Sequence, residues 1–194
     1  MNDRIYCYEG TDVLINKLGI QDADILATAE RKLTGLRILE LMQNPVEGGF
    51  DLQHLCDIHH YIFQDLYAWA GRLRDVDIAK GNLFCKAEYL DTECSRIFSA
   101  LSRERHLGVG TTQKAVKTLA YYFSEINALH PFREGNGRTQ REFIRQLALS
   151  EGYIIEFYKI TEEEMLDASR ESFLCNYGPM EDLFSRCLRA ICAD

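Results

Sequence analysis

The stretch His130-Pro-Phe-Arg-Glu-Gly-Asn-Gly-Arg-Thr-Gln-Arg141 separates two segments of helical periodicity. Before it, Thr112–Leu129 repeats apolar side chains at three- and four-residue spacing, which predicts an amphipathic helix. After it, a second helix is expected over Asn136–Ser150, ended by Gly152. The stretch is therefore predicted to be a loop that runs directly into the N-terminus of a helix.

The remainder of the chain also has a mainly helical texture. Only three prolines occur in 194 residues, which leaves room for long helices. We expect further helices at residues 22–42, 51–69, 87–105, 161–175 and from the Pro179 break to 191, with a short hairpin at 73–86. The predicted fold class is mainly α, one domain over residues 1–194, built as a helical bundle around the central loop and its helix.

Composition bounds the function. The formal net charge of -8 argues against a nucleic-acid partner, which usually selects a basic surface. No apolar stretch approaches 18 residues, and the first residues have no apolar core of a signal peptide, so no membrane partner is expected. Seven cysteines without a Cys-x-x-Cys pair indicate neither a disulfide framework nor a zinc site. A cytoplasmic location fits best, and secretion as an effector stays open.

The loop contains the features of an anion site. Gly135 and Gly137 flank Asn136, so backbone N–H groups can approach a phosphate closely at the positive end of the following helix. Arg138 and Arg141 are three residues apart on that helix, and each guanidinium can bind phosphate oxygens in a forked geometry. An acidic protein that handles a polyanion needs such a local concentration of positive charge.

Two further side chains suggest phosphoryl or nucleotidyl transfer. Glu134 is a hard oxygen ligand beside the expected phosphates, and Mg²⁺ commonly takes one or two carboxylates together with substrate phosphates. The side chain of histidine has an ordinary pKa near neutrality, so His130 can act as a general base. A nucleotide phosphate as substrate and Mg²⁺ as cofactor are what this combination predicts.

The same stretch resembles the signature of the Fic family, His-Pro-Phe-x-Asp/Glu-Gly-Asn-Gly-Arg-x-x-Arg, at every specified position. Two flanking segments are also similar to short bacterial Fic proteins: residues 8–17, Tyr-x-Gly-Thr-x-Val-Leu-x-Asn-Lys, and residues 58–74 with their Tyr-x-Trp-Ala-Gly-x-x-Arg ending. The resemblance covers nearly the whole chain. It implies the Fic fold and a protein adenylyltransferase.

The resemblance assigns a role to each motif residue. His130 would deprotonate a Ser, Thr or Tyr hydroxyl of a target protein, which attacks the α-phosphate of ATP. Glu134 would hold Mg²⁺, and Phe132 would anchor the loop in the core. The anion hole and the β- and γ-phosphate contacts would come from Gly135, Asn136, Gly137, Arg138 and Arg141, with Arg141 on the γ-phosphate.

The hairpin would be the flap that docks the target. An exposed strand edge can capture an extended segment by backbone pairing, and the alternative is a hairpin that only closes the fold. The docking residues would be Val76, Asp77, Ile78, Ala79, Lys80, Gly81 and Asn82. His59 and His60 are interpreted as packing or supporting groups rather than catalytic ones.

Regulation is inferred from a missing motif. Many Fic proteins carry Ser/Thr-x-x-x-Glu-Gly/Asn, whose glutamate pairs with the second motif arginine, but no glutamate here has Ser or Thr four residues before it. The nearest matches end at Glu47 and Glu151. We therefore expect a toxin that a small antitoxin inhibits in trans, with the ATPase subunits of DNA gyrase and topoisomerase IV as targets implied by resemblance only.

Other functions fit the same residues. A Doc-like kinase binds the nucleotide in the reverse orientation, although its motif departs around the second glycine and Gly137 is intact here. UMP or phosphocholine transfer would use the same fold. A non-catalytic interaction module, or an effector secreted to act on a host protein, would use the flap without requiring the toxin role.

Overall fold

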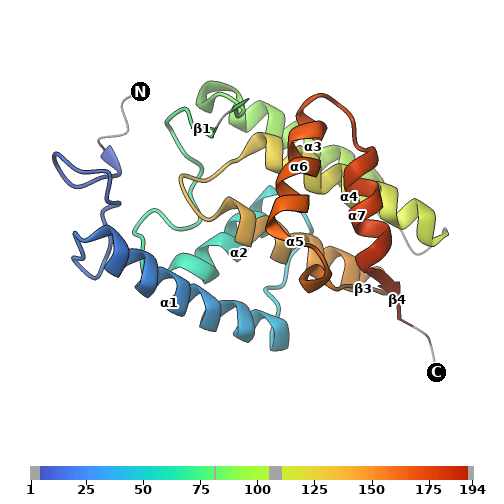
Figure 1. The fold of residues 1–194 in the computed structure, drawn as a ribbon, viewed down its shortest axis with the longest axis horizontal. Helices are drawn as coiled ribbons and strands as arrows, with labels where there is room; N and C mark the ends of the chain where they lie inside the picture. The colour runs from blue at the N-terminus through green and yellow to red at the C-terminus, as the bar shows by residue number, and fades with distance from the viewer. Residues whose placement is uncertain (1–4, 81, 105–110, 192–194) are drawn as a thin grey trace.

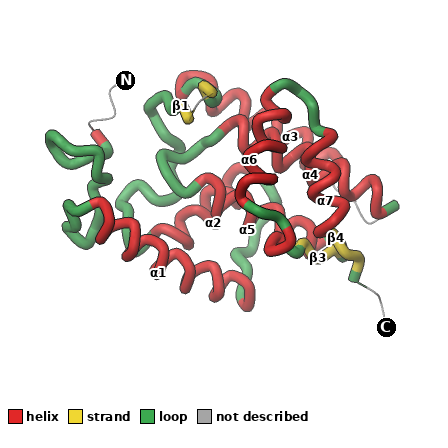
Figure 2. The backbone as a smooth tube through the Cα atoms, viewed as in Figure 1, coloured by secondary structure: helices red, strands yellow, loops and turns green. Residues whose placement is uncertain are grey.

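The computed structural model describes residues 5–80, 82–104 and 111–191. Within them it is mainly helical, as predicted (Figure 1, Figure 2). The elements in chain order are α1 Ala23–Gln43, α2 Leu52–Phe63, β1 Ala79–Lys80, β2 Asn82–Leu83, the 3-10 turn η2 Ala87–Tyr89, α3 Leu90–Glu104, α4 Thr112–Leu129, α5 Asn136–Ser150, β3 Tyr153–Ile155, the 3-10 turn η4 Phe157–Lys159, α6 Glu162–Phe173, α7 Gly178–Cys187 and β4 Leu188–Ala190.

Helix α5 lies at the centre of the bundle (Figure 1). It packs against α2, α4 and β3, while α1 lies on α2, and α6 and α7 lie on α4. Its apolar face is completely covered, with Phe143, Ile144 and Leu147 fully buried. Because burial of such side chains is the main stabilising term, the motif at the start of α5 is held by the core itself.

Side-chain caps set several helix starts. The Asp51 carboxylate accepts a hydrogen bond from the backbone N–H of His54 at the start of α2, and Thr111 does the same for α4. Thr161 and Glu164 form the predicted capping box of α6. The expected bounds of α4 and α5 agree with the structure.

Three helices end earlier than predicted. Helix α2 ends at Phe63 rather than near residue 69, because the chain there folds into successive turns, with Gly71 at a positive φ of 84°. Helix α6 ends at Phe173, before Cys175 adopts a positive φ of 59°. Helix α7 ends at Cys187, because Leu188–Ala190 forms β4 and pairs with Tyr153–Ile155.

The predicted hairpin exists, but its strands are only Ala79–Lys80 and Asn82–Leu83, paired antiparallel. Side chains rather than strand pairing hold the segment before it. The Asp75 carboxylate accepts from the Tyr6 hydroxyl at 2.8 Å, and that of Asp77 accepts from the Ala87 N–H at 2.8 Å. The expected residue Gly81 lies outside the described residues.

None of the helices in the described ranges is long and apolar enough to cross a membrane.

Candidate active site

The motif loop has two positions with left-handed backbone. His130 ends α4 with φ 47° and ψ 58°, and Gly135 precedes α5 with φ 82°. A Cβ on Gly135 would lie 2.1 Å from the ring of Phe63, so only glycine fits there. The loop can therefore turn sharply between the two helices and present the first N–H groups of α5.

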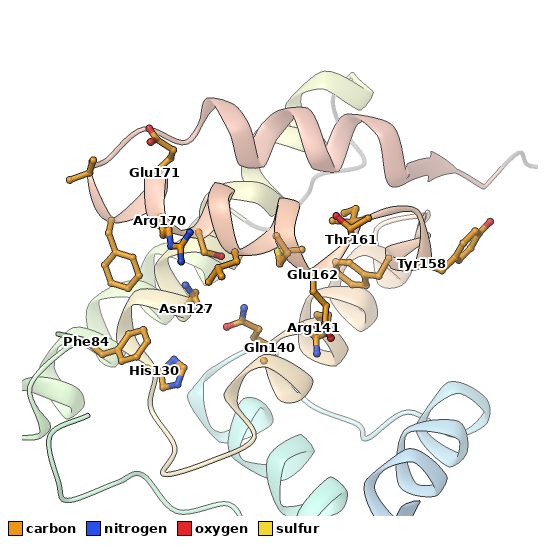
Figure 3. A pocket seen from close by; sticks show the side chains of 18 residues that line it. Phe84, Asn127, His130, Gln140, Arg141, Tyr158, Thr161, Glu162, Arg170 and Glu171 are labelled. Carbon is orange, nitrogen blue, oxygen red and sulfur yellow. The ribbon is translucent and has the colours of Figure 1, made fainter. Parts of the chain in front are cut away.

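His130 faces a cavity while most of its surface is covered. The imidazole stacks on Phe84, with ring centroids 3.8 Å apart and 13° between the planes, and the residue is 9 % exposed. Figure 3 shows the pair at one end of the cavity. This packing fixes the ring orientation of the predicted general base.

Arg74 connects the flap to this histidine. Its buried guanidinium donates to the His130 carbonyl at 2.8 Å and the Leu129 carbonyl at 3.2 Å, and also to the carbonyls of Val76 and Cys85 on either side of the flap. Burial lowers the pKa of Arg74. A buried arginine satisfied by backbone carbonyls is a positioning group. The sequence contained it in the Fic-like segment but did not indicate its partners.

Asn136 closes the loop with its side chain. Its carboxamide oxygen accepts from the Phe132 N–H at 2.8 Å, and its amide nitrogen donates to the Phe132 carbonyl at 2.7 Å. Phe132 is 1 % exposed, which confirms the predicted anchor. The Asn136 side chain therefore sets the loop shape, and its backbone N–H, as that of the first residue of α5, has no acceptor within the helix.

Glu134 lies immediately before this helix start. One carboxylate oxygen accepts from the Gly135 N–H at 2.8 Å, and the side chain is 31 % exposed. Its backbone carbonyl accepts from Nε2 of His59 at 3.0 Å. The carboxylate is thus accessible beside the expected phosphate position.

His59 supports the loop from α2. The Gly71 N–H donates to its Nδ1 at 2.7 Å, so the neutral ring carries its proton on Nε2 and donates to Glu134. The ring stacks on Phe132 at 3.9 Å. Burial lowers the pKa of His59 to about 3. These contacts agree with the expected packing and supporting role of His59, and Nδ1 of His60 lies 3.1 Å from the Ala70 carbonyl oxygen.

The two motif arginines have different surroundings. Arg141 lines the cavity, where burial and the nearby Arg138 lower its pKa and Glu162 opposes them. Among the described residues its side chain forms no ion pair or hydrogen bond. Arg138 contacts α1 instead, where its Nη2 lies 2.5 Å from a carboxylate oxygen of Glu30 and its Nη1 donates to Thr34 at 3.1 Å.

A cavity of about 1110 Å³ brings together His130, Gly137 and Arg141 of the motif. Its lining does not include Glu134, Asn136 or Arg138. Figure 3 shows Arg141 and Gln140 directed into it, between His130 and Tyr158. Its volume is comparable with ligand pockets of about 300–1,000 Å³. The sequence did not predict that α6 forms the opposite wall of the cavity. It also did not predict Asn127 as a lining residue, because the only indication is its position about one turn before His130 on α4.

Comparisons with known proteins agree with this geometry. The model of the Fic/DOC family matches residues 49–148. Probable protein adenylyltransferase Fic of Salmonella typhimurium is 38 % identical over 184 residues, covering 94 % of this chain and 91 % of that protein. Protein adenylyltransferase VbhT of Bartonella schoenbuchensis is 42 % identical over 177 residues, but this chain, 91 % of which is matched, spans only 37 % of its length.

Solved structures are also similar. The N-terminal Fic domain of a VirB-translocated effector from Bartonella quintana, with bound ADP, has a TM-score of 0.90 and 30 % identity over 96 % of this chain and 95 % of that one. BepC from Bartonella tribocorum, with bound AMPPNP, has a TM-score of 0.87 and 27 % identity over 96 % of this chain and 97 % of that one. The chain is therefore a member of the Fic/DOC family.

Proposed function

We propose that this chain transfers AMP from ATP to a Ser, Thr or Tyr hydroxyl of a target protein. The observation that carries the proposal is one cavity lined by His130, Gly137 and Arg141, with the start of α5 between the histidine and the arginine. Phosphates bound at this helix start would lie within reach of a base and a cation. Relatives named protein adenylyltransferase support the same reaction.

In the proposed reaction, His130 takes the proton of the target hydroxyl. The hydroxyl oxygen forms a bond to the α-phosphorus, and the bond from that phosphorus to the oxygen bridging to the β-phosphate breaks. Pyrophosphate leaves with the electron pair. The stacking on Phe84 supports this role because it holds the imidazole facing the cavity.

The start of α5 binds the remaining phosphates. The N–H groups of Asn136 and Gly137 bind them as a nest, and Arg141 binds the γ-phosphate. The N–H of Gly135 joins this nest when its present acceptor, the Glu134 carboxylate, turns to the metal ion. Arg138 reaches the β-phosphate with N–H groups that do not contact Glu30 or Thr34, since a guanidinium has five donors. These positive groups stabilise the negative charge that develops on pyrophosphate as its bond to the α-phosphorus breaks.

Glu134 fits a magnesium ion. The described residues contain no group of three or more His, Cys, Asp or Glu side chains able to hold a metal by themselves. One accessible carboxylate beside a phosphate site is the arrangement in which Mg²⁺ takes its other ligands from substrate and water. A bound Mg²⁺ would neutralise charge on the triphosphate.

The flap docks the target in this proposal. Its backbone is tied to His130 through Arg74, so an extended segment paired with residues 76–80 and 82 would be held in register with the base. This tie favours docking over a hairpin that only closes the fold.

A Doc-like kinase or another transferase is the second candidate on the same cavity. A non-catalytic module is disfavoured, because it needs neither the cavity nor a histidine facing it. The position of Gly137 next to Arg141 in the cavity wall favours the adenylyl-transfer orientation.

We further propose a bacterial toxin that acts in the cytoplasm and is inhibited by a small antitoxin. Among the described residues no glutamate, including Glu47 and Glu151, forms an ion pair with Arg141, which supports a γ-phosphate site that a partner's glutamate can block. The ATPase subunits of DNA gyrase and topoisomerase IV are the first targets to test.

The test uses the purified chain, a bacterial lysate and ATP labelled with ³²P at the α or the γ position. We expect a labelled band from α-label only, lost in His130→Ala and Arg141→Ala. A band from γ-label would indicate a kinase. No band from either label, even with the candidate target subunits added, would contradict a free toxin.

A further inference from the structure

Arg138 lies between two carboxylates, and it is much closer to one of them. Its Nη2 is 2.5 Å from Oε1 of Glu30 and 3.7 Å from Oε1 of Glu134. The first distance is that of a charge-assisted hydrogen bond, and the second is that of an ion pair without one. Nη2 of Arg138 therefore interacts more closely with Glu30 on α1 than with Glu134 in the motif loop.

Glu30 is itself held in place on α1. Its second carboxylate oxygen accepts from the hydroxyl of Tyr67, a residue that is 1 % exposed. Its backbone carbonyl accepts from Thr34, one turn further along the helix, and Thr34 in turn accepts from Arg138 at 3.1 Å. The partners of the Glu30 side chain thus come from the turns after α2 and from α5, which restricts it to one position.

The Arg138 guanidinium also lies over the ring of Phe63, 4.7 Å from its centroid. This contact adds a cation–π attraction from α2 to the hydrogen bonds that hold the guanidinium. Arg138 is consequently drawn toward α1 by a carboxylate and a hydroxyl, although Glu134 also lies within ion-pair distance of it.

We propose that Glu30 is a positioning residue for cation binding: it holds Arg138 on the α1 side of the motif, so that Arg138 does not compete with a divalent cation for Glu134. The proposal rests on the proposed function, in which Glu134 is the protein ligand of Mg²⁺. Without the Glu30 carboxylate, Glu134 is the nearest anion to Arg138. A cation must then displace an arginine before it binds.

Glu30→Gln is a suitable test variant because glutamine has a similar volume, and its carbonyl can still accept from Tyr67. The measurement is calorimetric binding of AMPPNP, first with EDTA and then at increasing Mg²⁺, which gives the Mg²⁺ concentration at half-effect. Circular dichroism and thermal unfolding check that each variant is folded.

We expect the Mg²⁺ half-effect concentration to rise about tenfold in Glu30→Gln, within the range for groups that orient metal ligands. AMPPNP binding in EDTA should change by less than about twofold. Glu40→Gln is the matched control, because Glu40 is on the same helix but pairs with Arg37 at 2.9 Å. It should leave the half-effect concentration unchanged.

A double-mutant cycle identifies the competitor. In an Arg138→Gln background, the further change Glu30→Gln should no longer alter the Mg²⁺ half-effect concentration. The inference would be overturned if the Mg²⁺ half-effect concentration rose equally in that background, or if it did not rise in Glu30→Gln itself. Either result would leave the proposed function standing. If Glu134→Ala shows the same Mg²⁺ dependence as the unmodified chain, the cation role of Glu134 in the proposed function falls together with the inference.

Discussion

His59 makes the stability of the motif loop depend on pH. The buried ring is locked neutral between the Gly71 N–H and the Glu134 carbonyl, and burial lowers its pKa from the ordinary 6.5 to about 3. In the unfolded chain the histidine regains its ordinary pKa. Between these two values the unfolded state binds a proton that the folded state does not, so the free energy of unfolding falls as the pH drops below 6.5.

The magnitude follows from the same shift. Over the roughly 1.5 pH units from pH 6.5 to pH 5, protonation of His59 stabilises the unfolded state by about 1.4 kcal/mol per pH unit. His59 alone therefore lowers the free energy of unfolding by about 2 kcal/mol. The assay is urea unfolding at pH 7 and pH 5 for the unmodified chain, His59→Gln and His59→Phe. Other titrating groups contribute equally to all three proteins and cancel in the comparison.

Both variants should be less stable at pH 7, by about 1–3 kcal/mol, because they lose one or both hydrogen bonds of the ring. Both should also lose about 2 kcal/mol less than the unmodified chain between pH 7 and pH 5. If the three proteins lose the same amount over this range, His59 is not held neutral and the account of the loop is wrong.

Further predictions concern the loop and the cavity. Gly135→Ala should cost about 3 kcal/mol in urea unfolding, because a Cβ meets Phe63, whereas Gly152→Ala, with a similar positive φ of 83° but no atom within 4 Å, should cost about 1–2 kcal/mol; equal losses would contradict the clash. Asn136→Ala should lower the free energy of unfolding by about 2–3 kcal/mol, since two buried backbone groups lose their partner, and a loss below about 0.5 kcal/mol would mean that the loop holds its shape without it. Arg141→Ala should lower kcat/KM for ATP about 100-fold with unchanged thermal unfolding; a loss of stability instead would indicate a structural role.

The parts of the fold that the sequence predicted are those with local signals. The bounds of α4 and α5 follow from apolar periodicity and from the glycines at 135 and 152, which act within one turn of the residues they affect. The strands at 153–155 and 188–190 were not predicted, because three residues are too few for alternation to be recognised and the pairing is between distant segments.

The prediction of the site likewise succeeded for neighbouring residues and failed for residues far apart in the sequence. The twelve-residue motif indicated a base, a carboxylate, an anion nest and two arginines, and the structure brings His130, Gly137 and Arg141 to one cavity. It did not indicate that Arg138 pairs with a glutamate 108 residues earlier in the chain. Glu30 has no feature in its own neighbourhood that distinguishes it from the other acidic residues of α1, so only the fold reveals the pair.

The divergence of the two arginines follows from their surroundings rather than from their spacing. Three residues correspond to about 300° around a helix, so the Cβ atoms of Arg138 and Arg141 are only about 60° apart, close enough to share a face. Yet one guanidinium has a carboxylate and an aromatic ring within reach, and the other has an open cavity. Long side chains adopt the position in which their charge is compensated. In the described structure, the guanidinium of Arg141 thus faces the cavity in which an anionic ligand can bind, whereas the charge of Arg138 is largely compensated by Glu30.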